Sequence, residues 1–205
     1  MKLAVRLALI TFAMTAFLTF MAVRAADLRA HGTEIIMPME PVDPRDILLG
    51  YYVIIRTPAH RIDTQAQEGP QTGWAPGEVI YVTLRETADG WRPTGAFREK
   101  PSQGVFLQGR VRRARTVSDM REVEPDIDKE QPGRIVREPI PGTERQELDV
   151  AYNLERYYTD SETAQELEGM RRQDRLRLIV SVGEDGAALI KGLEVDGQAR
   201  LETLF

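Results

Sequence analysis

The sequence predicts a mainly β protein of the α+β class, in which an N-terminal transmembrane helix precedes an antiparallel β-rich domain with one amphipathic helix. Residues 7–23 carry no charged side chain, which predicts a helix that enters a membrane. An Asp-Gly pair between two apolar runs is a strong hairpin signal, and antiparallel strands are joined by hairpins. Such pairs occur at Asp89-Gly90, Asp185-Gly186 and Asp196-Gly197.

The predicted membrane segment is residues 1–26, and the β-rich domain is residues 27–205. At ~1.5 Å per residue, a helix over residues 7–23 spans roughly 25 Å, which is at the short end for crossing a bilayer. Lys2 and Arg6 precede this run. Positive charge before a first membrane helix favours an N-terminus inside the cell. We therefore expect a single-pass protein of the cell membrane with its C-terminal domain on the extracytoplasmic side.

The same segment has the layout of a secretory signal peptide, with a basic start, an apolar middle and small residues at a cut. Val23-Arg24-Ala25 before Ala26 satisfies a small-x-small cleavage rule. The apolar run is longer than the core of a typical signal peptide, which favours an uncleaved anchor. Cleavage after Ala25 would instead give a secreted or periplasmic protein.

One side of the predicted membrane helix carries only small and hydroxyl-bearing side chains. At ~100° per residue these residues fall within about one quarter of the circumference. They are Ala4, Ala8, Thr11, Thr15, Thr19 and Ala22. A stripe of this kind allows a second helix to approach closely and to form hydrogen bonds across the contact. It predicts a helix-packing face, and the alternative is a signal sequence that is simply rich in alanine.

Strands make up most of the predicted domain, because β-branched and aromatic residues occur in short runs bounded by turn residues. The run YYVIIR at 51–56 follows Gly50, and residues 175–183 alternate apolar and polar side chains. The expected strands are 34–39, 51–56, 78–87, a return strand from 91, 104–116, 175–183, 187–195 and 199–205.

One soluble helix is expected at residues 161–173. Asp160 or Ser161 can cap its N-terminus, and arginines occupy its last turn. Apolar residues recur at three-residue spacing, at Ala164, Leu167 and Met170. Residues 61–77 and 117–146 are polar and rich in Pro and Gly, so we predict loops there.

Composition excludes several classes of function. The chain has 27 Lys and Arg against 32 Asp and Glu, a net charge of −5, which opposes binding to nucleic acid. Cysteine is absent, so disulfides and thiolate chemistry are excluded. His31 and His60 are the only histidines, too few for a multi-histidine metal centre. We therefore predict no cofactor and no metal ion.

Candidate reactive pairs are weak. Ser102 and Lys100 could form a Ser/Lys dyad, but no apolar setting is present to lower the lysine pKa. His60 with Asp63 could bind a metal weakly. The simpler interpretation of both His31 and His60 is that they lie in solvated loops.

Two charged clusters have equally simple interpretations. Asp126, Asp128 and Glu130 alternate as in a calcium loop, but Gln131 stands where an EF-hand requires glycine, which favours a solvated acidic loop. On a regular strand Arg110 and Arg112 would face opposite to Arg113 and Arg115. We expect these arginines to pair with the acidic run 122–130 and not to form one anion site.

Five segments of the chain match the pattern of a known family in the same order. They are PVDPRDILLGYYVII (41–55), YVTLRETADGWRP (81–93), GVFLQGRV (104–111), NLERYYTDSETAQELE (153–168) and ALIKGLEVDG (188–197). Together they resemble the GDYXXLXY family, a bacterial group described as membrane-anchored and of unknown function. Within the naming motif Gly50 and Tyr52 remain, whereas Tyr51, Ile55 and Thr57 replace its Asp, Leu and final Tyr. Relatives are often encoded beside polytopic membrane proteins, so the resemblance implies an integral membrane partner.

The motif region contains the residues that we single out as a possible binding site. They are Asp43, Pro44, Arg45, Asp46, Gly50, Tyr51 and Tyr52. A turn is the favoured interpretation, because Pro44 fixes its own φ, Asp43 can hydrogen-bond forward to the backbone, and Gly50 permits conformations that a side chain forbids.

The sequence favours binding over catalysis, and we assign no catalytic residue. We expect a membrane-anchored extracytoplasmic domain that acts as an interaction module for an integral membrane protein, with any small-molecule ligand unknown. One alternative is an extracytoplasmic hydrolase that uses carboxylates, such as those of Asp43 and Asp46. Another is a secreted binding protein, which would follow from cleavage after Ala25.

Overall fold

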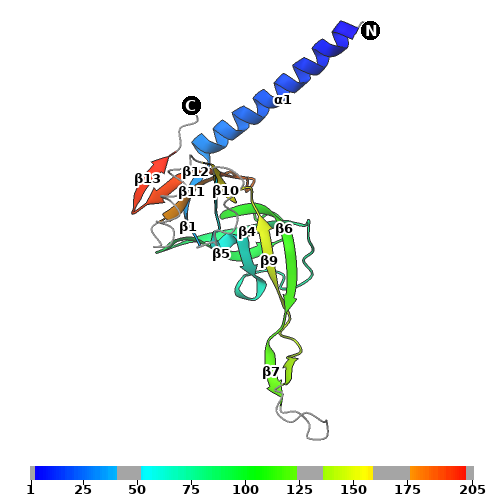
Figure 1. Cartoon of the computed structure of the whole chain (residues 1–205), viewed down its shortest axis with the longest axis vertical. Coiled ribbons are helices and arrows are strands. Elements are labelled where there is room, and N and C mark those ends of the chain that lie inside the picture. Colours follow the sequence, from blue (N-terminus) through cyan, green and yellow to red (C-terminus); the bar gives the residue numbers. More distant parts are fainter. Residues whose placement is uncertain (1–2, 41–51, 124–135, 159–175, 202–205) are drawn as a thin grey trace.

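The computed structural model describes residues 3–40, 52–123, 136–158 and 176–201, in which one long helix leads out of a body of strands (Figure 1). The helix, α1 (Leu3–His31), is continuous, and none of its described residues is buried. It is long and apolar enough to cross a membrane. The predicted layout of an apolar N-terminal helix before antiparallel sheets is confirmed.

The C-terminal end of α1 contacts a four-stranded antiparallel sheet. Its strands are β1 (Thr33–Pro38), β11 (Leu176–Val182), β12 (Ala188–Val195) and β13 (Gln198–Leu201), in the order β1-β11-β12-β13. The Asp196-Gly197 turn between β12 and β13 has both residues at positive φ, as a two-residue hairpin requires.

A five-stranded antiparallel sheet forms the rest of the body, in the order β3-β9-β6-β4-β5. Its strands are β3 (Arg61–Asp63), β4 (Val79–Thr87), β5 (Gly90–Phe97), β6 (Val105–Val117) and β9 (Arg145–Ala151).

Two short strand pairs complete the described structure. β2 (Tyr52–Ile54) pairs with β10 (Arg156–Tyr158), and a short 3-10 turn at Pro58–His60 follows β2. β7 (Met120–Val123) pairs with β8 (Val136–Pro139) in a hairpin that extends from the end of the molecule opposite to α1 (Figure 1).

The core joins the two large sheets. Ile35 and Leu178 from the first sheet and Val82 and Leu107 from the second are almost fully buried in one apolar cluster. The β11–β12 turn also touches β6, because the Gln108 backbone N–H donates to the Gly186 carbonyl at 2.8 Å. The sheets therefore form a single packed unit.

The strand predictions are confirmed at every run that the structure describes, although the strand expected at 51–56 is only three residues long. The prediction of loops at 61–77 and 117–146 is wrong in part, because β3, β7, β8 and the first residues of β9 lie there. The helix expected at 161–173 and the acidic residues Asp126, Asp128 and Glu130 lie outside the described residues.

The expected split of four arginines between two faces of β6 is wrong. The register joins Val111 to Val150 and Arg113 to Asp149, so Arg112 is the extra residue of a β-bulge. Val111 faces the core. After the bulge the alternation restarts, which brings three side chains to the outer face: Arg110, Arg113 and Arg115.

Candidate functional site

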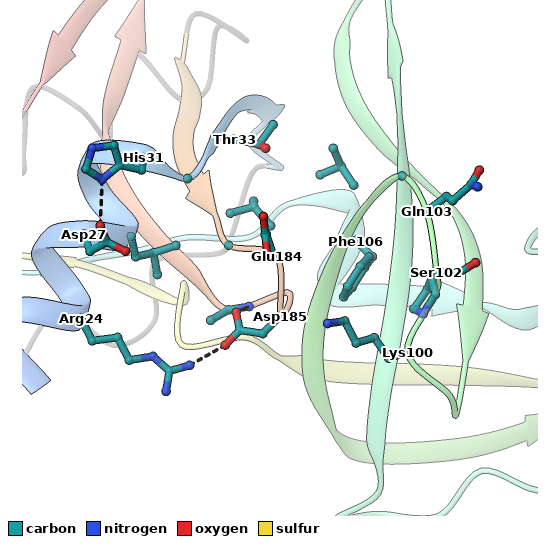
Figure 2. A pocket seen from close by; sticks show the side chains of 18 residues that line it. Arg24, Asp27, His31, Thr33, Lys100, Ser102, Gln103, Phe106, Glu184 and Asp185 are labelled. Carbon is teal, nitrogen blue, oxygen red and sulfur yellow. Dashed lines mark hydrogen bonds and ion pairs between the residues drawn. The ribbon is translucent and has the colours of Figure 1, made fainter. Parts of the chain in front are cut away.

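A cavity of about 820 Å³ lies where the helix meets the body (Figure 2). We call it the juxtamembrane cavity, because Arg24, which lines it, directly follows the charge-free run at 7–23 of the helix that is long and apolar enough to cross a membrane. Its walls come from the last turns of α1, the loop between β5 and β6, and the turn between β11 and β12.

The helix wall of this cavity follows from helical spacing. Arg24, Asp27, Leu28 and His31 are three or four residues apart, so they project from one side of α1. The same turns are fixed to the first sheet by hydrogen bonds. The Ser181 hydroxyl donates to the Leu28 carbonyl at 2.5 Å.

Further along the helix, Arg29 reaches the first sheet with both ends of its guanidinium. Its two NH₂ groups donate to the carbonyls of Ile190 and Lys191 at 3.1 and 3.0 Å. These bonds attach the last turns of α1 to the backbone of β12. The cavity is therefore held next to the end of the apolar run.

The cavity holds charges of both signs. Arg24 forms an ion pair with Asp185, and His31 Nδ1 lies 2.8 Å from Asp27 Oδ1 (Figure 2). Lys100 Nζ lies 6.0 Å from the centre of the Phe106 ring. Glu184 also lines the wall and has no ion pair in the described part of the chain. A mixed lining of this kind suits recognition of a polar or charged segment.

The geometry does not support a Ser102–Lys100 dyad or a metal site at His60 and Asp63. Ser102 and Lys100 both line the cavity, but no hydrogen bond joins them among the described residues. Asp63 caps a short turn by accepting from the Gln65 backbone N–H at 3.0 Å, and its other oxygen lies 3.5 Å from Arg145. Within the described ranges no group of three or more His, Asp or Glu side chains could hold a metal ion.

His60 is not the solvated loop residue that the sequence predicts, because the residue is only 4% exposed. The Thr57 backbone N–H donates to His60 Nδ1 at 3.1 Å, so the proton of the neutral ring is on Nε2. The ring meets Tyr152 edge-on at 5.5 Å, and Nε2 lies 3.7 Å from Glu155 Oε1. His31, in contrast, is exposed as expected.

Burial lowers the pKa of His60 below its usual value of 6.5, and the nearby Glu155 opposes this only in part. The unfolded chain therefore takes up a proton as the pH falls below 6.5, while the folded chain does not. We expect the free energy of unfolding to decrease from pH 6.5 downward, until the pH reaches the lowered pKa of the folded state.

Urea unfolding of the full chain in a neutral detergent, followed by tryptophan fluorescence, measures this slope. His60→Asn keeps an acceptor near Nδ1 but cannot titrate, so its stability should vary less between pH 6.5 and 5. Equal slopes in the parent and in His60→Asn would contradict a buried neutral His60.

The structure places the remaining predicted site residues as follows. Asp43, Pro44, Arg45, Asp46, Gly50 and Tyr51 lie outside the described residues, whereas Tyr52 begins β2 opposite Tyr158. The two other departures from the family motif are buried: Ile55 is 1% exposed, and Thr57 contacts His60. Thr57 therefore has a structural role at a position where the motif has tyrosine.

The stripe at Ala8, Thr11, Thr15, Thr19 and Ala22 is exposed along α1. At ~100° per residue it faces roughly away from the side of the helix that lines the juxtamembrane cavity. Stripe and cavity are therefore separate surfaces. Sequence reasoning missed the cavity because its three walls come from distant segments, and only the spacing of Arg24, Asp27 and His31 hinted at one wall.

No curated protein and no solved structure gives a significant match to this chain. The sequence model of the family described as GDYXXLXY protein matches residues 14–193, from within the apolar helix to two residues before the end of β12. This match covers most of the chain. It includes the five-stranded sheet, β1, β11 and most of β12, together with the wall of the cavity at the β11–β12 turn, whereas β13 lies outside it. The chain therefore belongs to the GDYXXLXY family.

Proposed function

We propose that this protein is a membrane-anchored extracytoplasmic interaction module that binds an integral membrane protein through α1. The observation that carries the proposal is the apolar surface of α1, which the described part of the chain leaves entirely uncovered. Seventeen or so residues of exposed apolar helix require lipid or another protein around them.

The way in which the helix is attached supports the same function. The Arg29 and Ser181 hydrogen bonds hold the base of α1 against the first sheet, so the domain has a fixed position beside the lipid. The small-residue stripe faces away from the juxtamembrane cavity. A second helix can pack against the stripe while the cavity stays open to a polar segment of the same partner.

Photocrosslinking from single positions in α1 tests the proposal. A crosslinking amino acid at Thr15, in the stripe, should give adducts with one membrane protein. The same amino acid at Phe17, which at ~100° per residue points to nearly the opposite side, should give lipid adducts. Adducts with lipid alone from both positions would contradict a protein partner.

We expect Thr15→Leu to weaken the association, because the larger side chain separates the two helices and removes a hydroxyl. With the crosslinking amino acid placed at Ala8, in the same stripe, the yield of adducts with the partner in membranes should fall severalfold in this variant. Phe17→Leu, which also introduces a leucine but on the other side of the helix, should leave the yield unchanged. An equal yield in both variants would show that the stripe is incidental.

A further inference from the structure

A second, smaller cavity of about 300 Å³ lies on the outer face of the five-stranded sheet. Four arginines from three separate segments line it: Arg56, Arg61, Arg113 and Arg115. Arg56 follows β2, Arg61 begins β3, and the other two are brought to this face by the β-bulge in β6. We call it the arginine cavity.

The arginine cavity has an excess of positive charge. Glu147 and Asp149 also line it, so two carboxylates face four guanidinium groups, in a chain whose net charge is −5. Register places Asp149 opposite both Arg61 and Arg113. Even so, none of the four arginines forms an ion pair within 4 Å among the described residues. Their donors are therefore available to a ligand.

One further residue that lines the cavity provides an independent observation. His60 lines it and is 4% exposed, and its Nε2 atom is buried without a hydrogen-bond partner in the described part of the structure. Glu155 Oε1, at 3.7 Å, is too distant to accept a hydrogen bond from it. A buried donor without a partner is costly, and such groups are frequent at functional sites.

We propose that the arginine cavity binds a ligand through an oxyanion group, a phosphate or a carboxylate. Guanidinium groups present planar pairs of N–H donors that match the oxygens of both groups. Arg113 and Arg115 are on the same face of one strand, and Arg61 lies across Asp149 from Arg113, so an oxyanion has donors on two sides. The site is separate from the membrane helix and does not depend on the function proposed for it.

The two histidines allow the binding site to be located in solution. His60 lies in the arginine cavity and His31 lines the juxtamembrane cavity, so their ring proton resonances report on the two sites separately. We expect titration of the full chain, in a neutral detergent, with inorganic phosphate or with succinate to move the His60 resonance to saturation. The His31 resonance should stay in place.

Two adjacent arginines provide a matched pair of variants. Arg113→Gln removes a lining guanidinium and should weaken binding of the saturating anion about tenfold, the usual effect of losing a hydrogen bond to a charged group. Arg112→Gln removes the same charge one residue away, at the bulge and outside the lining, and should change affinity less than twofold.

The two anions distinguish the source of the oxyanion. Saturation by phosphate alone assigns the site to phosphate-bearing ligands, and saturation by succinate alone assigns it to carboxylates. The proposal is overturned if neither anion saturates the His60 shift, if His31 shifts in parallel, or if Arg112→Gln weakens binding as much as Arg113→Gln does. The last result would indicate non-specific attraction by net charge.

Discussion

The double variant Ile10→Arg, Met14→Arg should lose stable integration into the membrane. Both residues are more than half exposed on α1, inside the run that has no charge. Each arginine near the centre of a membrane helix costs about 3 kcal/mol, so the pair opposes insertion by roughly 6 kcal/mol. The measurement is the fraction of protein that resists alkaline carbonate extraction from membranes.

The matched control is Ile10→Leu, Met14→Leu, which keeps the segment apolar and should remain in the membrane. The intact mass of the membrane-bound parent protein tests directly whether α1 is an uncleaved anchor, since an anchor retains residues 1–25. A protein that begins at Ala26 and is recovered in the soluble fraction would establish the secreted form instead. It would also rule out α1 as the contact with a membrane partner.

Gly186→Ala should be among the most destabilising single changes in the domain. Gly186 has φ of +81°, and a Cβ atom there would lie 2.8 Å from both Gln108 N and Phe106 Cε2. An L side chain at this φ costs about 1–2 kcal/mol, and forcing β6 away from the turn adds about 1–3 kcal/mol. Urea unfolding followed by the fluorescence of Trp74 and Trp91 measures the loss.

Gly197→Ala separates the two contributions. Gly197 has nearly the same φ, +80°, but nothing lies within 4 Å of the position of a Cβ. This variant should lose only the conformational part, so Gly186→Ala should be the less stable by about 1–3 kcal/mol. Equal losses would mean that the β11–β12 turn does not hold the two sheets together.

The sequence contained enough information to predict the hairpins, because turn chemistry and strand periodicity are local. Asp196-Gly197 is a clear example, since both residues take the positive φ that its type of turn demands. β9 also has a local pattern from which it could have been predicted. Gln146, Leu148 and Val150 are buried in alternation with exposed charged residues. Its high charge made the start of this strand look like part of a polar loop.

Other features depended on contacts between distant segments. The bulge at Arg112 is fixed by the pairing of β6 with β9, and a one-residue shift of this kind reverses the faces of all later side chains. His60 is buried because Tyr152 and Glu155 pack over it from another part of the chain. Neither the arginine cavity nor the juxtamembrane cavity therefore had a signature in any single stretch of sequence.

The junction between α1 and β1 ties the direction of the helix rigidly to the first sheet. Gly32 is the single residue between them, and a Cβ atom there would lie 2.3 Å from Ser181 Oγ and 2.6 Å from the Leu28 carbonyl oxygen. This one-residue connection is too short to let α1 rotate independently of β1. A change in the tilt of α1 must turn the sheets with it, and the β7–β8 hairpin, at the far end, sweeps the widest arc (Figure 1).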